Sequence, residues 1–142
     1  MPALEGTPAG NRAEDQGRAA ASPTMCQPPA MKIVQPGLGP GRAINQFGSA
    51  GAVHLGRARF DGPGGLTFIR LEPGGHLGRH PTVLAQLYCV VEGSGWVSGR
   101  EGERVVVEVG HAAMWDPGEE HESGTDTGMT VAVLEAASVR TT

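Results

Sequence analysis

From Met31 onward, the chain consists of short apolar runs separated by turns that contain glycine or proline. The 23 glycines and 11 prolines are spread along the chain, and no long stretch repeats apolar residues with the period of a helix. Glycine supplies the positive φ angles of tight turns, and proline ends helices. Many closely spaced short strands without helices between them predict an all-β sandwich or barrel.

The apolar runs set the expected strands. Val53 to Phe60 roughly alternates between apolar and polar residues, as a half-buried strand does. Gly93 separates two such runs, and this pattern predicts a hairpin there. We expect strands near residues 31–35, 52–60, 65–72, 86–92, 94–98, 103–109, 112–115 and 129–136.

Residues 1–30 differ in composition from the rest of the chain. They are rich in alanine, glycine, proline and small polar residues and contain almost no bulky apolar side chains. Such a segment cannot bury enough surface to offset its ordering entropy. We therefore predict a flexible, disordered tail over residues 1–30 and one domain over residues 31–142.

Charge and hydropathy argue against several classes of partner. The net charge is −4 and the pI is near 5.7, and lysine and arginine form no cluster that would track a nucleic-acid backbone. No apolar run approaches the ~20 residues of a membrane helix. The N-terminus has no secretory signal, and Cys26 and Cys89 are poor candidates for a disulfide. We expect a cytoplasmic protein that binds neither nucleic acid nor membrane.

Two spaced motifs lie in the second half of the chain. The first contains Gly74, His80, Gln86 and Gly93, and the second contains Gly110, Gly118 and His121. On these residues the sequence resembles the cupin superfamily, over most of the chain from Met31 onward. The resemblance implies a jelly roll, the double-stranded β-helix. It also implies a divalent metal held inside the barrel by three histidines and one glutamate.

The sequence departs from this motif at two ligand positions. Thr82 stands where the second histidine belongs, and Gln86 stands in place of the glutamate. The resemblance therefore implies a metal site formed by His80, Gln86 and His121, with Thr82 lining the pocket. A glutamine oxygen brings no charge, so it neutralises a dication poorly. The set could hold iron, manganese, nickel, zinc or copper, and the spacing does not choose among them.

Each candidate residue also has a plainer interpretation. His80 and His121 could be structural histidines held by hydrogen bonds, and Gln86 could be a buried amide that fixes its strand. Glu122, next to His121, is a candidate general base or positioning group, or else a solvated charge. Tyr88 shares the strand parity of Gln86 and could donate a proton to a substrate, or pack in the core.

Two functions fit this pattern. The first is a metal-dependent enzyme, similar to an oxygenase or an isomerase, that acts on a small organic molecule. The second is a non-catalytic cupin that binds or senses a small ligand with a degraded metal site. The retained histidines favour the enzyme slightly, and the lost histidine and carboxylate favour the binding protein. Small cupins are commonly dimers, so we expect a homodimer, in contact through the N-terminal strands or Val105–Val107.

Overall fold

The computed structural model describes residues 31–36 and 39–141, and the predicted tail over residues 1–30 lies outside this part. The described residues form ten strands, one short 3-10 turn and no α-helix, which confirms the all-β prediction. No helix there is long and apolar enough to cross a membrane. The strands are β1 (Lys32–Val34), β2 (Arg42–Ile44), β3 (Ala52–His54), β4 (Ala58–Leu71), β5 (His76–Pro81), β6 (Ala85–Ser98), β7 (Arg104–Glu108), β8 (Ala112–Trp115), β9 (Glu120–Gly124) and β10 (Met129–Thr141).

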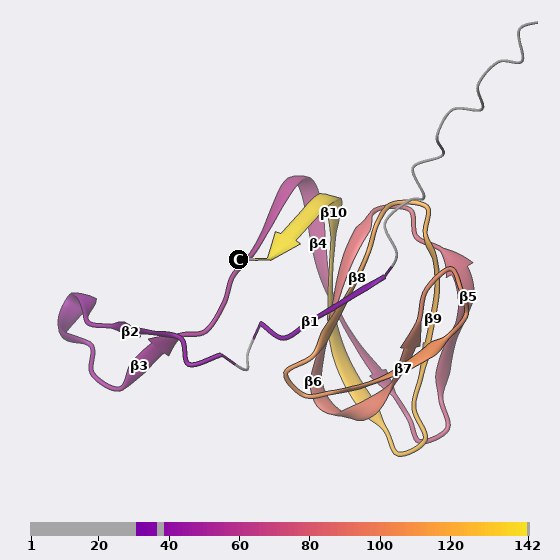
Figure 1. The fold of residues 1–142 in the computed structure, drawn as a ribbon, viewed down its shortest axis with the longest axis horizontal. Helices are drawn as coiled ribbons and strands as arrows, with labels where there is room; N and C mark the ends of the chain where they lie inside the picture. Colours follow the sequence, from indigo (N-terminus) through magenta and orange to yellow (C-terminus); the bar gives the residue numbers. More distant parts are fainter. Residues whose placement is uncertain (1–30, 37–38, 142) are drawn as a thin grey trace, which may run out of the picture.

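Strand β6 organises the barrel, because its two halves belong to two different strand layers (Figure 1). Its first half pairs with β8 and β10, in the order β1-β8-β6-β10-β4. Its second half pairs with β7 and β9, and β9 in turn pairs with β5. All these pairings are antiparallel. The long strand therefore joins the layer that contains β8 to the layer that carries β5 and β9.

The predicted hairpin at Gly93 is wrong, because β6 continues without a turn from Ala85 to Ser98. Gly93 has φ 75°, and the register with β10 shifts between Thr130 and Val131. A Cβ atom at Gly93 would lie 2.2 Å from the Gly128 carbonyl oxygen. Glycine thus serves here as a bulge that lets two backbones approach closely, rather than as a turn residue.

Other strand predictions also need correction. The expected strands over 52–60 and 65–72 are instead the short β3 and one long strand, β4, which runs through Gly62–Gly65. Strands β2, β5 and β9 were not predicted at all. β5 and β9 are polar and contain glycine or proline, so their sequences resemble turns. These two unpredicted strands carry both motif histidines.

The core lies between the two layers, where apolar side chains of β6, β7, β8 and β10 meet. Trp115 and Tyr88 are its largest fully buried side chains. The apolar core comprises Leu71, Tyr88, Val90, Val97, Val107, Ala113, Trp115, Met129, Val131 and Val133.

Part of the chain lies outside the barrel. The β2–β3 hairpin pairs only with itself among the described residues, and it projects away from the barrel (Figure 1). Residues 58–61 of β4 and 138–141 of β10 pair with each other beyond the end of β6. We call this second segment the outer ribbon.

Candidate functional site

The two motif histidines meet across the β5–β9 ladder. His80 stands directly opposite His121 in the register, and the ring centroids are 4.4 Å apart at an interplanar angle of 56°. Residues directly opposite each other in an antiparallel pair share a face of the sheet. The motif spacing therefore brings two imidazoles together, and we call His80 and His121 the imidazole pair.

His121 is the buried member of the pair. Only 5% of the residue is exposed, and its ring lies against Trp115 with the centroids 4.6 Å apart. Its Nδ1 atom is inaccessible to water and completes no hydrogen bond, although backbone groups of Glu119 and His80 lie near the ring and act to raise its pKa. Burial, together with the nearby His80, lowers the pKa of His121 to about 4. The ring is therefore neutral at neutral pH, which is the state in which histidine ligates a metal or accepts a hydrogen bond.

His80 is the exposed member. Its Nδ1 atom lies 2.6 Å from the Gly78 carbonyl oxygen. A carbonyl can only accept, so this contact assigns the proton to Nδ1 when the ring is neutral. The lone pair of His80 is then on Nε2, and a metal or ligand could engage it there.

Gln86 has different neighbours from the imidazole pair. It is 8% exposed on β6, and its Nε2 donates to Glu135 Oε1 at 2.6 Å. It lines a cavity of about 280 Å³ together with Lys32, Trp115 and Arg140, and neither motif histidine lines that cavity. Trp115 contacts His121 and also borders the Gln86 cavity. The structure thus associates Gln86 with Glu135 more directly than with the imidazoles.

Thr82 binds the turn that precedes β9. Its hydroxyl donates to the Asp116 carbonyl at 2.7 Å, and its backbone N–H donates to the Glu119 carbonyl at 3.0 Å. Its own carbonyl accepts from the Gly118 N–H at 2.8 Å. Thr82 is buried, and these three bonds hold the end of β5 against the 116–119 turn.

Tyr88 lies in the barrel core. Its ring packs edge-on against Trp115 with centroids 5.5 Å apart. Its hydroxyl approaches the Ser123 hydroxyl, but neither oxygen completes a hydrogen bond. Burial raises the pKa of Tyr88, so the phenol stays protonated at neutral pH. The interior thus contains several polar atoms without partners: Tyr88 Oη, Ser98 Oγ, Trp115 Nε1, Glu119 Oε1, His121 Nδ1 and Ser123 Oγ.

Glu122 lies apart from Tyr88. It follows His121 on β9, and successive side chains on a strand point to opposite faces. Glu122 lines a separate cavity with His76, Trp96 and Arg104. The structure does not bring the two candidate catalytic residues to one site.

The available nitrogen and oxygen donors limit which kind of metal site these residues could form. Within the described residues, no group of three or more histidines, cysteines, aspartates or glutamates is placed to hold an ion. The imidazole pair supplies two nitrogen donors, and the N–H of the Gln86 amide is already bonded to Glu135. These residues fit a two-imidazole site open to an outside ligand, and they do not fit a closed centre with three or four protein ligands.

Several residues around the site were not singled out from the sequence. Trp115, a core residue, packs against His121. Glu135 and Ser123 gave no signal, because their roles depend on strand register. Ser98 could have been found as a small polar residue at the end of the largely apolar strand β6.

Comparison with solved structures connects this architecture to known proteins. A cupin 2 domain-containing protein from Halorhodospira halophila is similar at a TM-score of 0.52 and 11% identity, over 79% of each chain. A conserved protein of unknown function from Streptococcus pyogenes is similar at 0.50 and 16% identity, over 58% of this chain and 75% of that one. A protein described as a predicted oxalate decarboxylase from Thermotoga maritima gives 0.45 and 22% identity. The match covers 49% of this chain and spans 62% of the length of that protein.

Neither a scan against models of protein families nor a comparison with curated proteins finds a match. At identities this low, likeness to solved structures shows the fold alone. The two similar structures at a TM-score of 0.50 or above, one of them a cupin 2 protein, agree with the paired layers around β6. The chain therefore has the cupin fold, a double-stranded β-helix, as its two sequence motifs predicted.

Proposed function

We propose that this protein binds a small polar organic molecule at the imidazole pair. The observation that carries the proposal is the contact of two imidazoles, the buried, neutral ring of His121 and the exposed ring of His80. The contact of His80 Nδ1 with the Gly78 carbonyl leaves its Nε2 as an acceptor. A bound molecule could donate a hydrogen bond to this Nε2 from solvent.

We favour binding without catalysis. A general acid or base must lie within hydrogen-bond reach of the proton it transfers. Glu122 lines a different cavity, and the raised pKa of Tyr88 keeps its phenol protonated. Gln86 is bonded to Glu135. The geometry thus supports recognition by the imidazole pair better than it supports proton transfer.

A metal-dependent enzyme, similar to an oxygenase or an isomerase, is the second candidate. The imidazole pair favours it, because His121 is neutral and His80 presents Nε2 away from its Gly78 contact. His80 and His121 would hold iron, manganese, nickel, zinc or copper, with the remaining positions open to an outside ligand. The bound ion would act as a Lewis acid or activate oxygen. His121 would orient the ligand, while Trp115 would exclude water from its inner face.

The test is metal analysis combined with nitrogen NMR on protein purified without a histidine tag. The binding proposal expects little metal and a His80 Nε2 resonance typical of an unprotonated ring nitrogen. Near-stoichiometric metal that is lost in His121→Ala, but kept in the matched control His76→Ala, would favour the enzyme instead. A neutral His80 ring with its proton on Nε2 would contradict both candidates.

We further propose that the protein works as a homodimer in the cytoplasm. Strand β4 is the last strand of its sheet and exposes Leu66 and Phe68, and the β2–β3 hairpin exposes Phe47 almost completely. Exposed apolar side chains on an edge strand are typical of a contact with another chain. Light scattering that found only a monomer at micromolar concentration would contradict the dimer.

A further inference from the structure

A second apolar surface lies on the face of the sheet that points away from the core. Strand β10 lies between β4 and β6 (Figure 1), and its residues Val131 and Val133 are buried in the core. Successive side chains on a strand alternate between the two faces, so the residues between them point outward. Three rows of directly opposed residues cross the three strands there: Leu66 with Leu134 and Leu87, Phe68 with Ala132 and Cys89, and Arg70 with Thr130 and Glu92. We call these nine residues the outer sheet face.

The outer sheet face has an uneven shape. On β4, Phe68 is 69% exposed and Leu66 is 58% exposed. Ala132 and Cys89, which share the row of Phe68, have small side chains and are half-buried. The β4 side therefore forms a ridge, and the small residues beside it form a shallow depression. Contiguous exposed apolar surface of this kind is typical of a contact with another chain.

The chain that covers this face must itself present large apolar side chains. Residues 1–30 contain one leucine and no valine, isoleucine or aromatic residue, so this segment is poorly suited to cover it. A second copy of the chain carries the same ridge of Leu66 and Phe68 and the same depression at Ala132 and Cys89. Two copies can therefore fill each other's depression through the same surface, which is an isologous contact.

The charges at the edge of the outer sheet face select one arrangement of the two copies. Arg70 and Glu92 are exposed and stand on opposite sides of Thr130. A two-fold axis along β10, between two stacked sheets, exchanges the β4 side for the β6 side. Each Arg70 then faces the partner's Glu92, and opposite charges are complementary across an interface. An axis across the strands would instead set Arg70 against the partner's Arg70 or against the apolar rows.

We propose that two copies stack their outer sheet faces about a two-fold axis along β10, with Phe68 of each copy packed over the partner's Cys89. This inference rests on the homodimer proposed above, and it assigns the surface and the symmetry of that dimer. Aligned sheets stack about 10 Å apart at an angle of roughly 30°, so each ridge can fill the facing depression. The imidazole pair lies on β5 and β9, in the other layer of the barrel, and this contact does not cover it.

The first test compares two exposed apolar residues by sedimentation velocity of the full chain. Phe68→Asp puts a charge into the proposed contact and should raise the dissociation constant of the dimer at least tenfold. Val106→Asp is the matched control, because Val106 is 76% exposed on β7, in the other layer, and this variant should dimerise like the wild type. An unchanged dimer in Phe68→Asp, or dissociation in Val106→Asp alone, would overturn this surface but leave the homodimer standing. A wild-type chain that stays monomeric at every concentration would overturn both.

The second test is charge reversal, which reports the symmetry of the dimer. Arg70→Glu and Glu92→Arg should each weaken the dimer several-fold, because each variant places like charges opposite each other. The two substitutions together restore opposite charges, so the double variant should dimerise within twofold of the wild type. A double variant as weak as the single variants would overturn the proposal.

The Cys89 thiol gives a readout that needs no change in the outer sheet face. Cys89 is free and half-buried, and the partner's Phe68 would cover it in the dimer. In the variant Cys26→Ser, iodoacetamide should alkylate Cys89 at least fivefold more slowly above the dissociation constant than below it. Equal rates in the two states would overturn the proposal.

Discussion

The two ends of strand β10 share one ladder but differ in their surroundings. Between Met129 and Ala136, β10 pairs with β6 on one side and β4 on the other, and alternate side chains are buried in the barrel. From Ser138 to Thr141 it pairs with β4 alone, in the outer ribbon. A register irregularity between Ala136 and Ser138 marks the boundary.

The difference shows what holds this fold together. Backbone hydrogen bonds join β10 to β4 in both regions, so those bonds alone cannot account for a difference in stability. The barrel end adds a third strand and a packed face, and an isolated two-stranded ribbon is at best marginally stable in water. The imidazole pair lies on strands of the barrel, where burial can hold side chains in place.

Hydrogen exchange should give the largest contrast between the two ends. We expect the Val131 and Val133 amides to exchange only through global unfolding, and the Val139 and Arg140 amides to exchange through local opening. The free energies of exchange should then differ by about 5 kcal/mol or more. Equal protection along β10 would mean that another chain covers the outer ribbon, and dilution should then abolish that protection.

Truncating one aromatic side chain in each region compares their packing. Trp115 is 2% exposed and contacts Tyr88 and His121, so Trp115→Ala should lower the free energy of unfolding by about 3–5 kcal/mol. Phe68 on β4 is 69% exposed, and Phe68→Ala should change it by less than about 0.5 kcal/mol in the monomer. Urea unfolding measures both values. A large, concentration-dependent loss for Phe68→Ala would instead support the dimer.

The barrel should also carry a pH dependence. The pKa of His121 falls from its usual 6.5 to about 4 on folding. Between pH 6.5 and about 4, His121 binds a proton in the unfolded chain but not in the folded chain. Stability should therefore fall as the pH drops through this window, by up to about 3 kcal/mol. His121→Asn should flatten the curve between pH 6.5 and 4, and the exposed-site control His76→Asn should not.

The charge pair of the outer ribbon should matter least. Arg140 donates to Asp61 at 2.5 Å and, with Ser138, lowers the pKa of that carboxyl group. Both side chains are largely exposed, and water and salt screen such pairs. We expect Asp61→Asn to leave the melting temperature unchanged at physiological salt. A clear drop would show that the ribbon is buried in an assembly.

The sequence predicted the all-β class and the cupin fold, because both depend on local signals. Apolar runs and glycine turns mark β7 and β8 closely, whereas the paired strands that carry His80 and His121 were missed. The hairpin at Gly93 was wrong for a reason that local sequence does not contain. Whether a glycine turns a chain or bulges it depends on the backbone that lies opposite, here Gly128.

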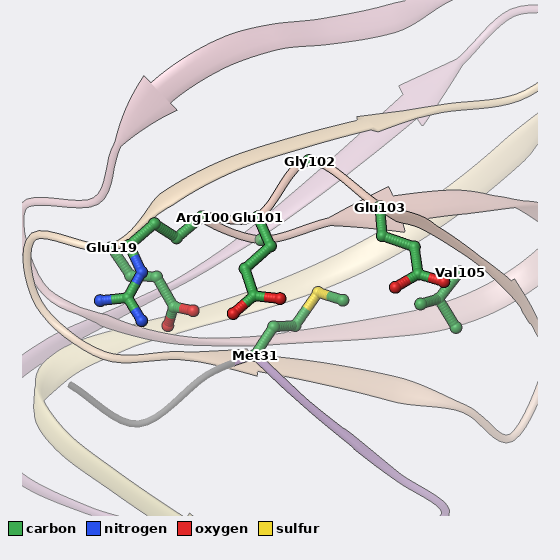
Figure 2. Close-up of a pocket in the computed structure, with 8 residues that line it drawn as sticks. Met31, Arg100, Glu101, Gly102, Glu103, Val105 and Glu119 are labelled. Atoms are coloured by element: carbon green, nitrogen blue, oxygen red, sulfur yellow. The ribbon is translucent and has the colours of Figure 1, made fainter. Parts of the chain in front are cut away.

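The surroundings of the site were harder to predict. The resemblance to cupins implied that Gln86 lines the pocket. Gln86 is buried, but its partner Glu135 comes from a strand far along the chain. β5 and β9 look like turns because their polar residues face a site rather than a core. A cavity of about 180 Å³ joins Met31, the turn after β6 and the turn before β9 (Figure 2), and only tertiary structure assembles those three segments.

The hydrogen bonds of Thr82 to the 116–119 turn limit how this chain could evolve toward a metal centre with more protein ligands. Thr82 occupies the position at which a further histidine would be needed. Its hydroxyl donates a hydrogen bond to the Asp116 carbonyl. Replacing Thr82 by histidine would add a nitrogen that can ligate a metal, and it would remove this hydrogen bond at the same time. Another interaction would first have to hold the 116–119 turn. The fold itself therefore disfavours the return of a histidine at this position.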